Sequence, residues 1–145
     1  MTHKIDLLRS LEQEMGILAR RMRRVAAERA RAVSPDLQIA GFFVLTHLSS
    51  QGPARSAEVV DVLGIDKGAV SRQVQHLVEL GLVTRTPDPQ DRRATILSLT
   101  EYGEQRLAEV AIQRRASIDE RLSDWNDDEL TTFVDALARY NRSLS

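Results

Sequence analysis

The chain has 145 residues, of which 42% are hydrophobic and 28% are charged, as is usual for one soluble globular domain. It contains no cysteine, which excludes disulfide scaffolds, thiolate metal sites and cysteine-based redox sensing. No window approaches the roughly 18 uncharged apolar residues of a membrane span, and the N-terminal residues are rich in charge. The sequence therefore predicts a cytoplasmic protein with neither a membrane span nor a secretory signal.

The net charge of −1 conceals an asymmetry along the chain. Up to Leu99 there are 14 basic and 11 acidic residues, a balance of +3, whereas the remainder has 6 basic and 10 acidic residues, a balance of −4. A basic first part indicates a polyanionic partner, with a chance distribution as the alternative.

The first third of the chain predicts two helices. Apolar residues recur every three or four positions over residues 5–32, which indicates a long amphipathic helix. Residues 34–36 (Ser-Pro-Asp) are typical of a helix start, so a second helix is expected from there to Leu48, before Gly52 and Pro53. Because its apolar residues cover much of its circumference, the second helix should be central.

A pair of short helices is expected next. Ser56 can cap a helix over residues 57–63, and Gly64 is a typical helix terminator. Asp66 is placed to cap the following helix, which should end near Gly81. Two short helices joined by a tight turn form a helix-turn-helix pattern.

The segment after this pattern changes character. Residues 82–85 and 95–99 are short, β-branched and roughly alternating, and they are separated by a polar loop over residues 87–93. This is the pattern of a two-stranded β-hairpin. Attached to a helix-turn-helix, such a hairpin is called a wing.

The last third predicts two more helices. Thr100 can cap a long helix with acids in its first turn, and Asn126 with Glu129 forms a capping box for a final helix. The expected fold is therefore mainly α, a winged helix-turn-helix with long helices at both ends, in one domain over residues 1–145.

One face of the second short helix is a candidate nucleic-acid-binding surface. On a helical wheel its apolar residues cluster on one side, while Arg72, Gln75 and His76 face away. Arg72 and Gln75 can read guanine and adenine edges, Ser71 can reach a phosphate, and the helix N-terminus favours anions. The predicted surface comprises Lys67, Gly68, Ser71, Arg72, Gln75 and His76. An ordinary solvated helix face is the alternative.

The hairpin loop carries two arginines at its tip. Arg92 and Arg93 can cross a phosphate backbone and insert a guanidinium into a narrow minor groove. Asp91 beside them would be repelled by phosphates, unless it accepts hydrogen bonds from an arginine or from loop amides and so fixes the shape of the tip. We favour that orienting role.

These residues resemble a known family. The run from Asp91 to Thr100 (Asp-Arg-Arg-Ala-Thr-Ile-Leu-Ser-Leu-Thr) and the run from Leu77 to Arg85 are similar to the wing region of the MarR family, the multiple-antibiotic-resistance regulators. The family consists of dimeric winged helix-turn-helix transcription regulators. The resemblance implies that Arg93 is the minor-groove arginine, Asp91 its positioning partner, and Arg92 the occupant of a variable position.

The resemblance also implies an assembly and an activity. Residues 34–99 would be the DNA-binding lobe, and residues 1–33 and 100–145 would be dimerisation helices that intertwine with a second subunit. The alternative for these helices is to fold back over a monomeric core. The expected activity is that of a repressor on a palindromic double-stranded DNA operator, which it would bind as a homodimer.

Family members commonly respond to small aromatic or anionic effectors. The residues that could line such a site here are Arg23, Phe42, Phe43 and His47. For each of them, ordinary packing or solvation is the competing interpretation. No cofactor is expected, and the three scattered histidines give no metal-ligand spacing, although His47 and carboxylates of the long helices could converge in space.

No enzyme motif is present: the sequence has no Gly-rich phosphate loop, no nucleophile elbow and no His-Glu-x-x-His helix. Two other functions remain as alternatives to a ligand-responsive repressor. One is a winged helix that binds protein, and the other is an architectural DNA-binding protein without an effector.

Overall fold

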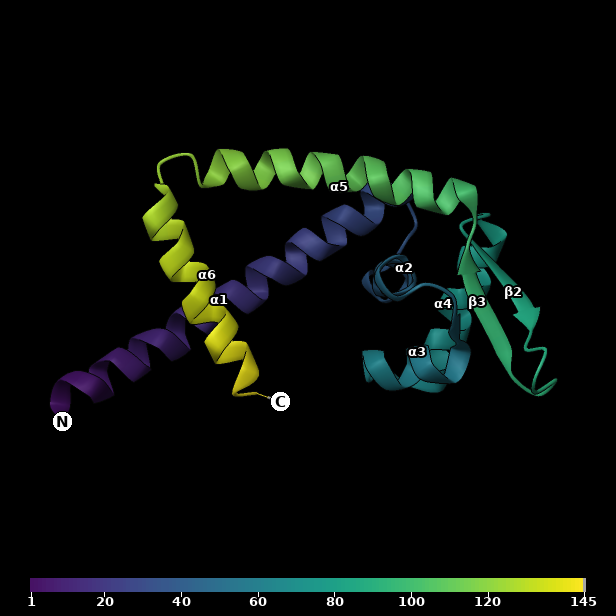
Figure 1. Ribbon diagram of the computed structural model, residues 1–145, viewed down its shortest axis with the longest axis horizontal. Helices are drawn as coiled ribbons and strands as arrows, with labels where there is room; N and C mark the ends of the chain where they lie inside the picture. Colours follow the sequence, from purple (N-terminus) through teal and green to yellow (C-terminus); the bar gives the residue numbers. More distant parts are fainter. Residues whose placement is uncertain (145) are drawn as a thin grey trace. The chain divides into compact units, whose positions relative to one another are not determined.

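The computed structural model describes residues 1–144, and over this range the chain is mainly helical with one small sheet (Figure 1). The elements follow in the order α1 (Thr2–Val33), α2 (Ile39–Gln51), β1 (Ala54–Arg55), α3 (Ser56–Leu63), α4 (Lys67–Glu79), β2 (Val83–Pro87), β3 (Thr95–Leu99), α5 (Glu101–Arg121) and α6 (Asp127–Arg142). Two compact units divide the chain, one over residues 1–110 and one from Ala111 onward.

Helix α2 lies at the centre of the first unit, as its apolar circumference predicts. It packs against α1, α3, α4 and β3. The core around it is closed, because its largest side chains are less than 2% exposed: Leu45, Leu77, Leu82, Leu97, Val44, Val59, Val70 and Val83. We call residues 34–99, which supply these side chains, the central lobe.

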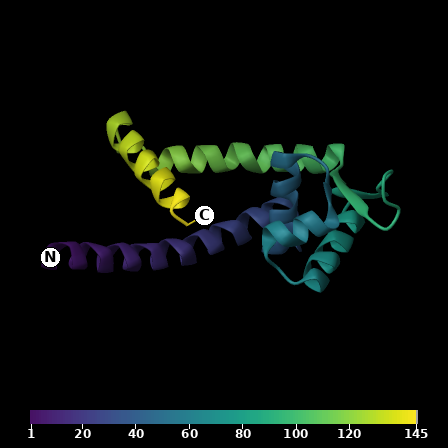
Figure 2. The ribbon, with the colours of Figure 1, turned by 60° about the horizontal axis from the view of Figure 1, so that its bottom comes forward.

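The wing is confirmed, and it is larger than the sequence indicates. Strands β2 and β3 pair antiparallel from Val83 opposite Leu99 to Pro87 opposite Thr95. In the described residues the sheet has a third strand, β1, which pairs with the other edge of β3 in the order β1-β3-β2. Two residues carry too little periodicity to be recognised as a strand. Figure 2 shows the hairpin loop projecting beyond the helices of the lobe.

Two predicted helix starts are wrong. Helix α2 begins at Ile39, not at Ser34, because the Leu37 N–H donates to the Ser34 carbonyl at 3.0 Å and residues 34–37 form a turn. Proline suits the second position of a turn as well as the first turn of a helix. Ser56 is the first residue of α3 and does not cap it, since the N-cap is Arg55, without a side-chain hydrogen bond.

The other predicted terminators and caps are confirmed. Gly64 and Gly81 have φ angles of 59° and 74°, the left-handed conformation that glycine adopts readily. The Ala69 N–H donates to the Asp66 carboxylate at 3.1 Å and starts α4. The Gly103 N–H donates to the Thr100 hydroxyl at 2.9 Å and starts α5.

Thr100 also joins three elements of the lobe. Its hydroxyl donates to the Gly81 carbonyl at 2.6 Å, and its N–H donates to the Leu82 carbonyl at 3.0 Å. Gly103 packs on the same segment so closely that a Cβ there would lie 2.2 Å from the Leu82 oxygen. The end of α4, the base of the wing and the start of α5 therefore meet at one point.

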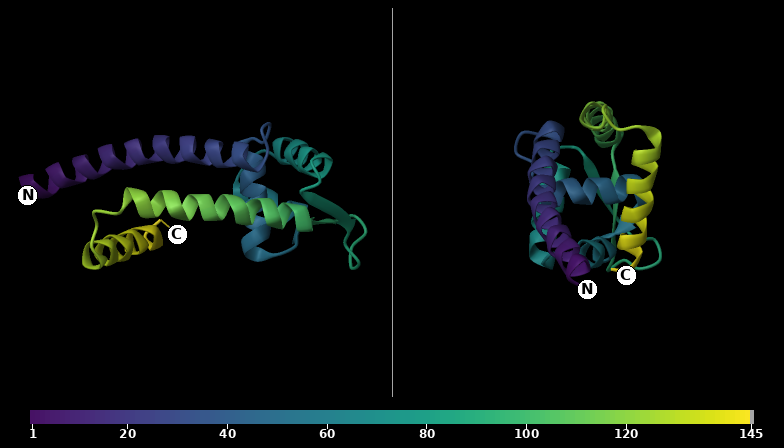
Figure 3. Two further views of the ribbon diagram at one scale, coloured as in Figure 1. Left: turned by 90° about the horizontal axis from the view of Figure 1, so that it is seen from above. Right: turned by 90° about the vertical axis from the view of Figure 1, so that its left-hand side faces the viewer.

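Helix α1 leaves the lobe as a long, gently curved helix (Figure 3). Its last turn is buried at Ala30 and Val33, and the Arg106 guanidinium donates to the Ala32 and Val33 carbonyls at 2.6 and 3.3 Å. The stripe of large apolar residues before that turn is exposed: Ile5, Leu7, Leu8, Leu11, Leu18 and Met22.

The second unit contains the end of α5 and helix α6. The predicted capping box is confirmed, with the Glu129 N–H donating to Asn126 at 2.9 Å and the Asn126 N–H donating to Glu129 at 3.0 Å. The rings of Trp125 and Phe133 pack edge to face, with their centroids 5.5 Å apart. Within the described residues α6 has no buried side chain, and Phe133, Val134 and Leu137 are exposed.

None of the helices in residues 1–144 combines the length and the apolar character needed to cross a membrane.

Candidate nucleic-acid interface

Helix α4 is held by one face and exposes the other. Val70, Val74 and Leu77 are buried against the lobe, and the Asp66 cap fixes the start of the helix. Of the predicted surface residues, four are exposed: Lys67, Ser71, Arg72 and Gln75. These side chains leave the lobe without disturbing its core, so they are available to an outside partner.

Gly68 and His76 are less accessible than the helical wheel predicts. Both are half-buried, and the His76 Nε2 atom is enclosed without a hydrogen-bond partner among the described residues. At the N-terminus of α4, the Asp66 carboxylate already takes the Ala69 N–H. The main polar contacts available on α4 therefore come from exposed side chains more than from backbone amides.

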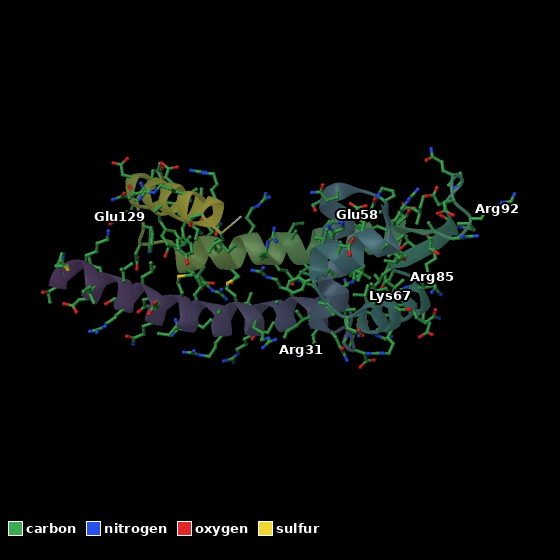
Figure 4. All side chains as sticks on the ribbon, turned by 90° about the horizontal axis from the view of Figure 1, so that it is seen from below. Arg31, Glu58, Lys67, Arg85, Arg92 and Glu129 are labelled. Atoms are coloured by element: carbon green, nitrogen blue, oxygen red, sulfur yellow. The ribbon has the colours of Figure 1, made fainter. Side chains whose placement is uncertain are left out.

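A groove of about 610 Å³ lies between the helix-turn-helix and the wing. Its lining includes four cationic side chains, Arg55, Lys67, Arg85 and Arg93, against two acidic ones, Asp61 and Asp91. Figure 4 shows the labelled Lys67, Arg85 and Arg92 at the same end of the lobe, with Arg92 on the projecting loop. The groove thus carries a net positive charge beside the exposed face of α4, which suits a phosphate backbone.

Asp91 shapes the tip of the wing through backbone contacts. Its carboxylate accepts a hydrogen bond from the Arg93 N–H at 3.0 Å, and its carbonyl accepts one from the Ala94 N–H at 2.9 Å. The carboxylate therefore fixes the backbone of Arg93, which is exposed, as is Arg92. Of the two partners that the sequence left open for Asp91, the printed hydrogen bond is to a loop amide.

An ion pair between a buried carboxylate and an exposed arginine anchors the wing to the rest of the lobe. Asp88 is only 5% exposed, and one of its carboxylate oxygens lies 2.5 Å from the Arg55 guanidinium on β1. The other oxygen accepts from the Gln90 N–H at 2.9 Å. That hydrogen bond, followed by the charge of Arg55, lowers the pKa of Asp88 below its ordinary value.

Arg55, Arg85 and Asp88 were missed by sequence reasoning. Arg85 lies on β2 and donates to the Gln75 carbonyl oxygen of α4, and the Gln75 amide nitrogen donates to Glu79 at 3.0 Å. The only signal for Asp88 was its place between two prolines, which reads equally well as a turn. The two arginines lie on strands whose pairing partners are distant in sequence, so no local pattern marks them.

A second cavity, of about 510 Å³, brings together three of the four predicted effector residues. Arg23 of α1 lines it with Phe42 and Phe43 of α2, and the other lining residues are Met22, Ala26, Arg29, Ile39, Ala40 and Ile65. His47 is not part of this lining; it is half-buried, and its Nε2 atom has no hydrogen-bond partner in the described part of the chain. The cavity is apolar on the α2 side and carries arginine on the α1 side.

Within residues 1–144 no three His, Asp or Glu side chains converge in a way that could hold a metal ion.

A helix-turn-helix whose second helix stands exposed beside a cationic wing defines the class of winged helix-turn-helix DNA-binding proteins. Comparison with known proteins agrees with this class. The model of the MarR family matches residues 36–94, which run from the turn before α2 to the wing.

Three relatives illustrate the match. The chain is 27% identical over 134 residues to the HTH-type transcriptional regulator YxaD of Bacillus subtilis, covering 92% of each protein. It is 33% identical over 93 residues to the HTH-type transcriptional repressor NicR of Pseudomonas putida, covering 63% of this chain and 59% of NicR. A crystal structure of a mutant MarR from Escherichia coli superposes with a TM-score of 0.75 at 26% identity, covering 90% of this chain and 95% of that one.

The chain belongs to the MarR family. It is a DNA-binding transcription regulator of the winged helix-turn-helix type, and not an enzyme.

Proposed function

We propose that the chain is a repressor that binds a palindromic operator as a homodimer and is released by a small aromatic or anionic effector. The observation that carries the proposal is the cationic groove between α4 and the wing, beside the exposed side chains of α4. Since its partner would be operator DNA inside the cell, the site of action would be the cytoplasm.

The two DNA-reading elements would take different grooves. Helix α4 would enter the major groove, where Arg72 and Gln75 meet base edges and Ser71 and Lys67 meet phosphates. Gly68 allows close approach at the helix start, and His76 would contribute from its half-exposed edge. Arg93, held by Asp91, would insert into the minor groove, with Arg92 on the flanking backbone.

Exposed apolar surface supports the homodimer. The stripe on α1 and the residues Phe133, Val134 and Leu137 of α6 are exposed in a single chain. Exposed apolar residues grouped on one helix mark an interaction site, and a second copy of the chain would cover each group in a two-fold arrangement. A two-fold dimer would present its two α4 helices to half-sites about 34–36 Å apart.

The cavity between α1 and α2 is the proposed effector site. Its aromatic wall would stack on an aromatic ring, and Arg23 would pair with a carboxylate. Because α1 carries the dimerisation stripe and α2 packs on α4, an effector wedged between them would change the spacing of the two α4 helices. His47 lies outside the cavity lining and would act only through the packing of α2.

The test is binding of the purified protein to duplexes from the DNA flanking its own gene, measured by fluorescence anisotropy at several salt concentrations against a scrambled duplex. Palindrome-dependent binding by two subunits per site is the expected result, and aromatic acids should then reduce it. Weak binding that ignores sequence would contradict specific repression and favour an architectural role. No binding to any duplex at low salt would favour a protein-binding winged helix.

A further inference from the structure

Gln75 is held by two charged residues, one on its own helix and one on the wing. Its carbonyl oxygen accepts a hydrogen bond from the Arg85 guanidinium of β2, and its amide nitrogen donates to the Glu79 carboxylate one helical turn later, at 3.0 Å. All three side chains are exposed, and Arg85 also lines the groove between the helix-turn-helix and the wing.

The two partners permit one orientation of the amide only. A guanidinium has only donors and a carboxylate has only acceptors. If the Gln75 amide rotated by 180°, its NH2 group would face the donors of Arg85, and its oxygen would face the acceptors of Glu79. Both hydrogen bonds would be lost and replaced by repulsion, so the wing strand and the helix end together fix the amide.

The fixed amide has one donor and one acceptor left. Its NH2 group has two hydrogens, of which Glu79 takes one, and its oxygen has two lone pairs, of which Arg85 takes one. Adenine presents an acceptor at N7 and a donor at N6 in the major groove, which matches this remainder. Guanine presents two acceptors there, which an amide can satisfy only with both of its hydrogens.

We propose that Arg85 and Glu79 are positioning residues that hold Gln75 in the orientation that selects adenine and rejects guanine. This rests on the proposed function, because it assumes that α4 enters the major groove. Through Arg85 the wing would influence the choice of a base that it does not itself contact.

The experiment begins with selection of bound duplexes from a randomised library by the wild-type protein and by Gln75→Ala. The base pair whose preference disappears in Gln75→Ala is the one that Gln75 reads. If the wild-type protein selects no sequence, the proposed function fails. If it selects a sequence but Gln75→Ala changes no position, the proposed function stands and the positioning role is overturned.

A matched pair of variants at Glu79 then separates the effect of the Gln75 amide orientation from the effect of the Glu79 charge. Glu79→Ala and Glu79→Gln remove the same negative charge, but only the glutamine keeps an acceptor for Gln75. We expect Glu79→Ala to reduce the preference for adenine over guanine at that base pair by about tenfold, since a bidentate contact gives discrimination of this order. Glu79→Gln should keep the preference within about twofold. Equal preferences in the two variants would overturn the proposal.

Arg85 is tested against an arginine that does not touch Gln75. Arg85→Met should reduce the same preference by about tenfold, whereas Arg92→Met, which also removes one positive charge, should weaken binding to all sequences alike. Adding Arg85→Met to Gln75→Ala should cause no further loss of discrimination. If Arg85→Met instead behaves like Arg92→Met, Arg85 is a phosphate contact and not a positioning residue.

Discussion

The central lobe and helix α1 differ in what covers their apolar side chains. In the lobe, Leu45, Leu77 and Leu97 are completely buried by other parts of the same chain. On α1, Ile5, Leu8 and other residues of the stripe are about half exposed, although their spacing along the helix is regular. The apolar side chains of the lobe are thus covered within the chain, whereas most of α1 has the pattern of a buried helix without the burial, which is the property expected of an interface.

The lobe should be sensitive to a change in its core. Leu45→Ala is expected to lower the free energy of unfolding by about 2–5 kcal/mol, because it removes a fully buried side chain and leaves a cavity. Chemical denaturation followed by circular dichroism measures this loss. Val62→Ala, at an exposed position of α3, is the control and should cost under about 0.5 kcal/mol. Similar losses for the two variants would show that the lobe core is not where stability resides.

Helix α1 should respond in its association instead. Leu11→Glu places a charge in the exposed stripe and is expected to weaken the dimer by about 2–3 kcal/mol, since one buried leucine contributes about this much. Light scattering over a range of protein concentrations measures the dissociation constant. Glu12→Gln changes a neighbouring exposed charge and should leave the dimer intact. A wild-type chain that is monomeric throughout the range would contradict the assignment of the stripe as an interface.

The exposed face of the lobe should affect DNA binding without affecting folding. Arg72→Ala is expected to cost about 1–3 kcal/mol in operator binding if Arg72 reads a guanine, and to relax the preference at one base pair. Arg93→Ala should lower the affinity for the operator. It should also abolish the preference for sequences with a narrow minor groove. Anisotropy titrations measure both effects, and an unchanged isotherm for either variant removes that residue from the interface.

The smallest predicted effect is a change in the stability contribution of Asp88 at low pH. The pKa of Asp88 is lower in the folded protein than its ordinary value of 3.8, so the contacts of Asp88 stabilise the fold fully at pH values above that ordinary value. This contribution is lost as the pH falls through the lower pKa of the folded protein. The stability difference between wild type and Asp88→Asn should therefore shrink as denaturation is repeated from pH 6 down to pH 3. A constant difference would mean that the carboxylate charge does not stabilise the wing.

Local patterns predicted most of the fold. The caps at Asp66, Thr100 and Asn126 and the glycine terminators are decided by neighbouring residues, and the structure contains them. The predicted start of α2 was wrong because residues 34–36 fit a turn and a helix start equally well. Strand β1 was not predicted because its two residues become a strand only by pairing with β3.

The candidate site divides in the same way. Arg72 and Gln75 could be identified from helical periodicity, and Arg93 from its loop. Arg55 and Arg85 could not, because the reason for their importance is a partner more than nine residues away in sequence: Asp88 for Arg55 and Gln75 for Arg85. Such contacts depend on how strands and helices pack, which no local sequence pattern reveals.

The contacts of Thr100 restrict how α4 and the wing can move relative to each other. One hydroxyl joins the glycine that ends α4 to the first turn of α5, and the adjacent N–H holds the base of the wing. A tilt of α5 would therefore move α4 and the wing together. If α4 and the wing bind DNA as proposed, each half-site would be bound or released in a single step, and an effector would need only to tilt α5.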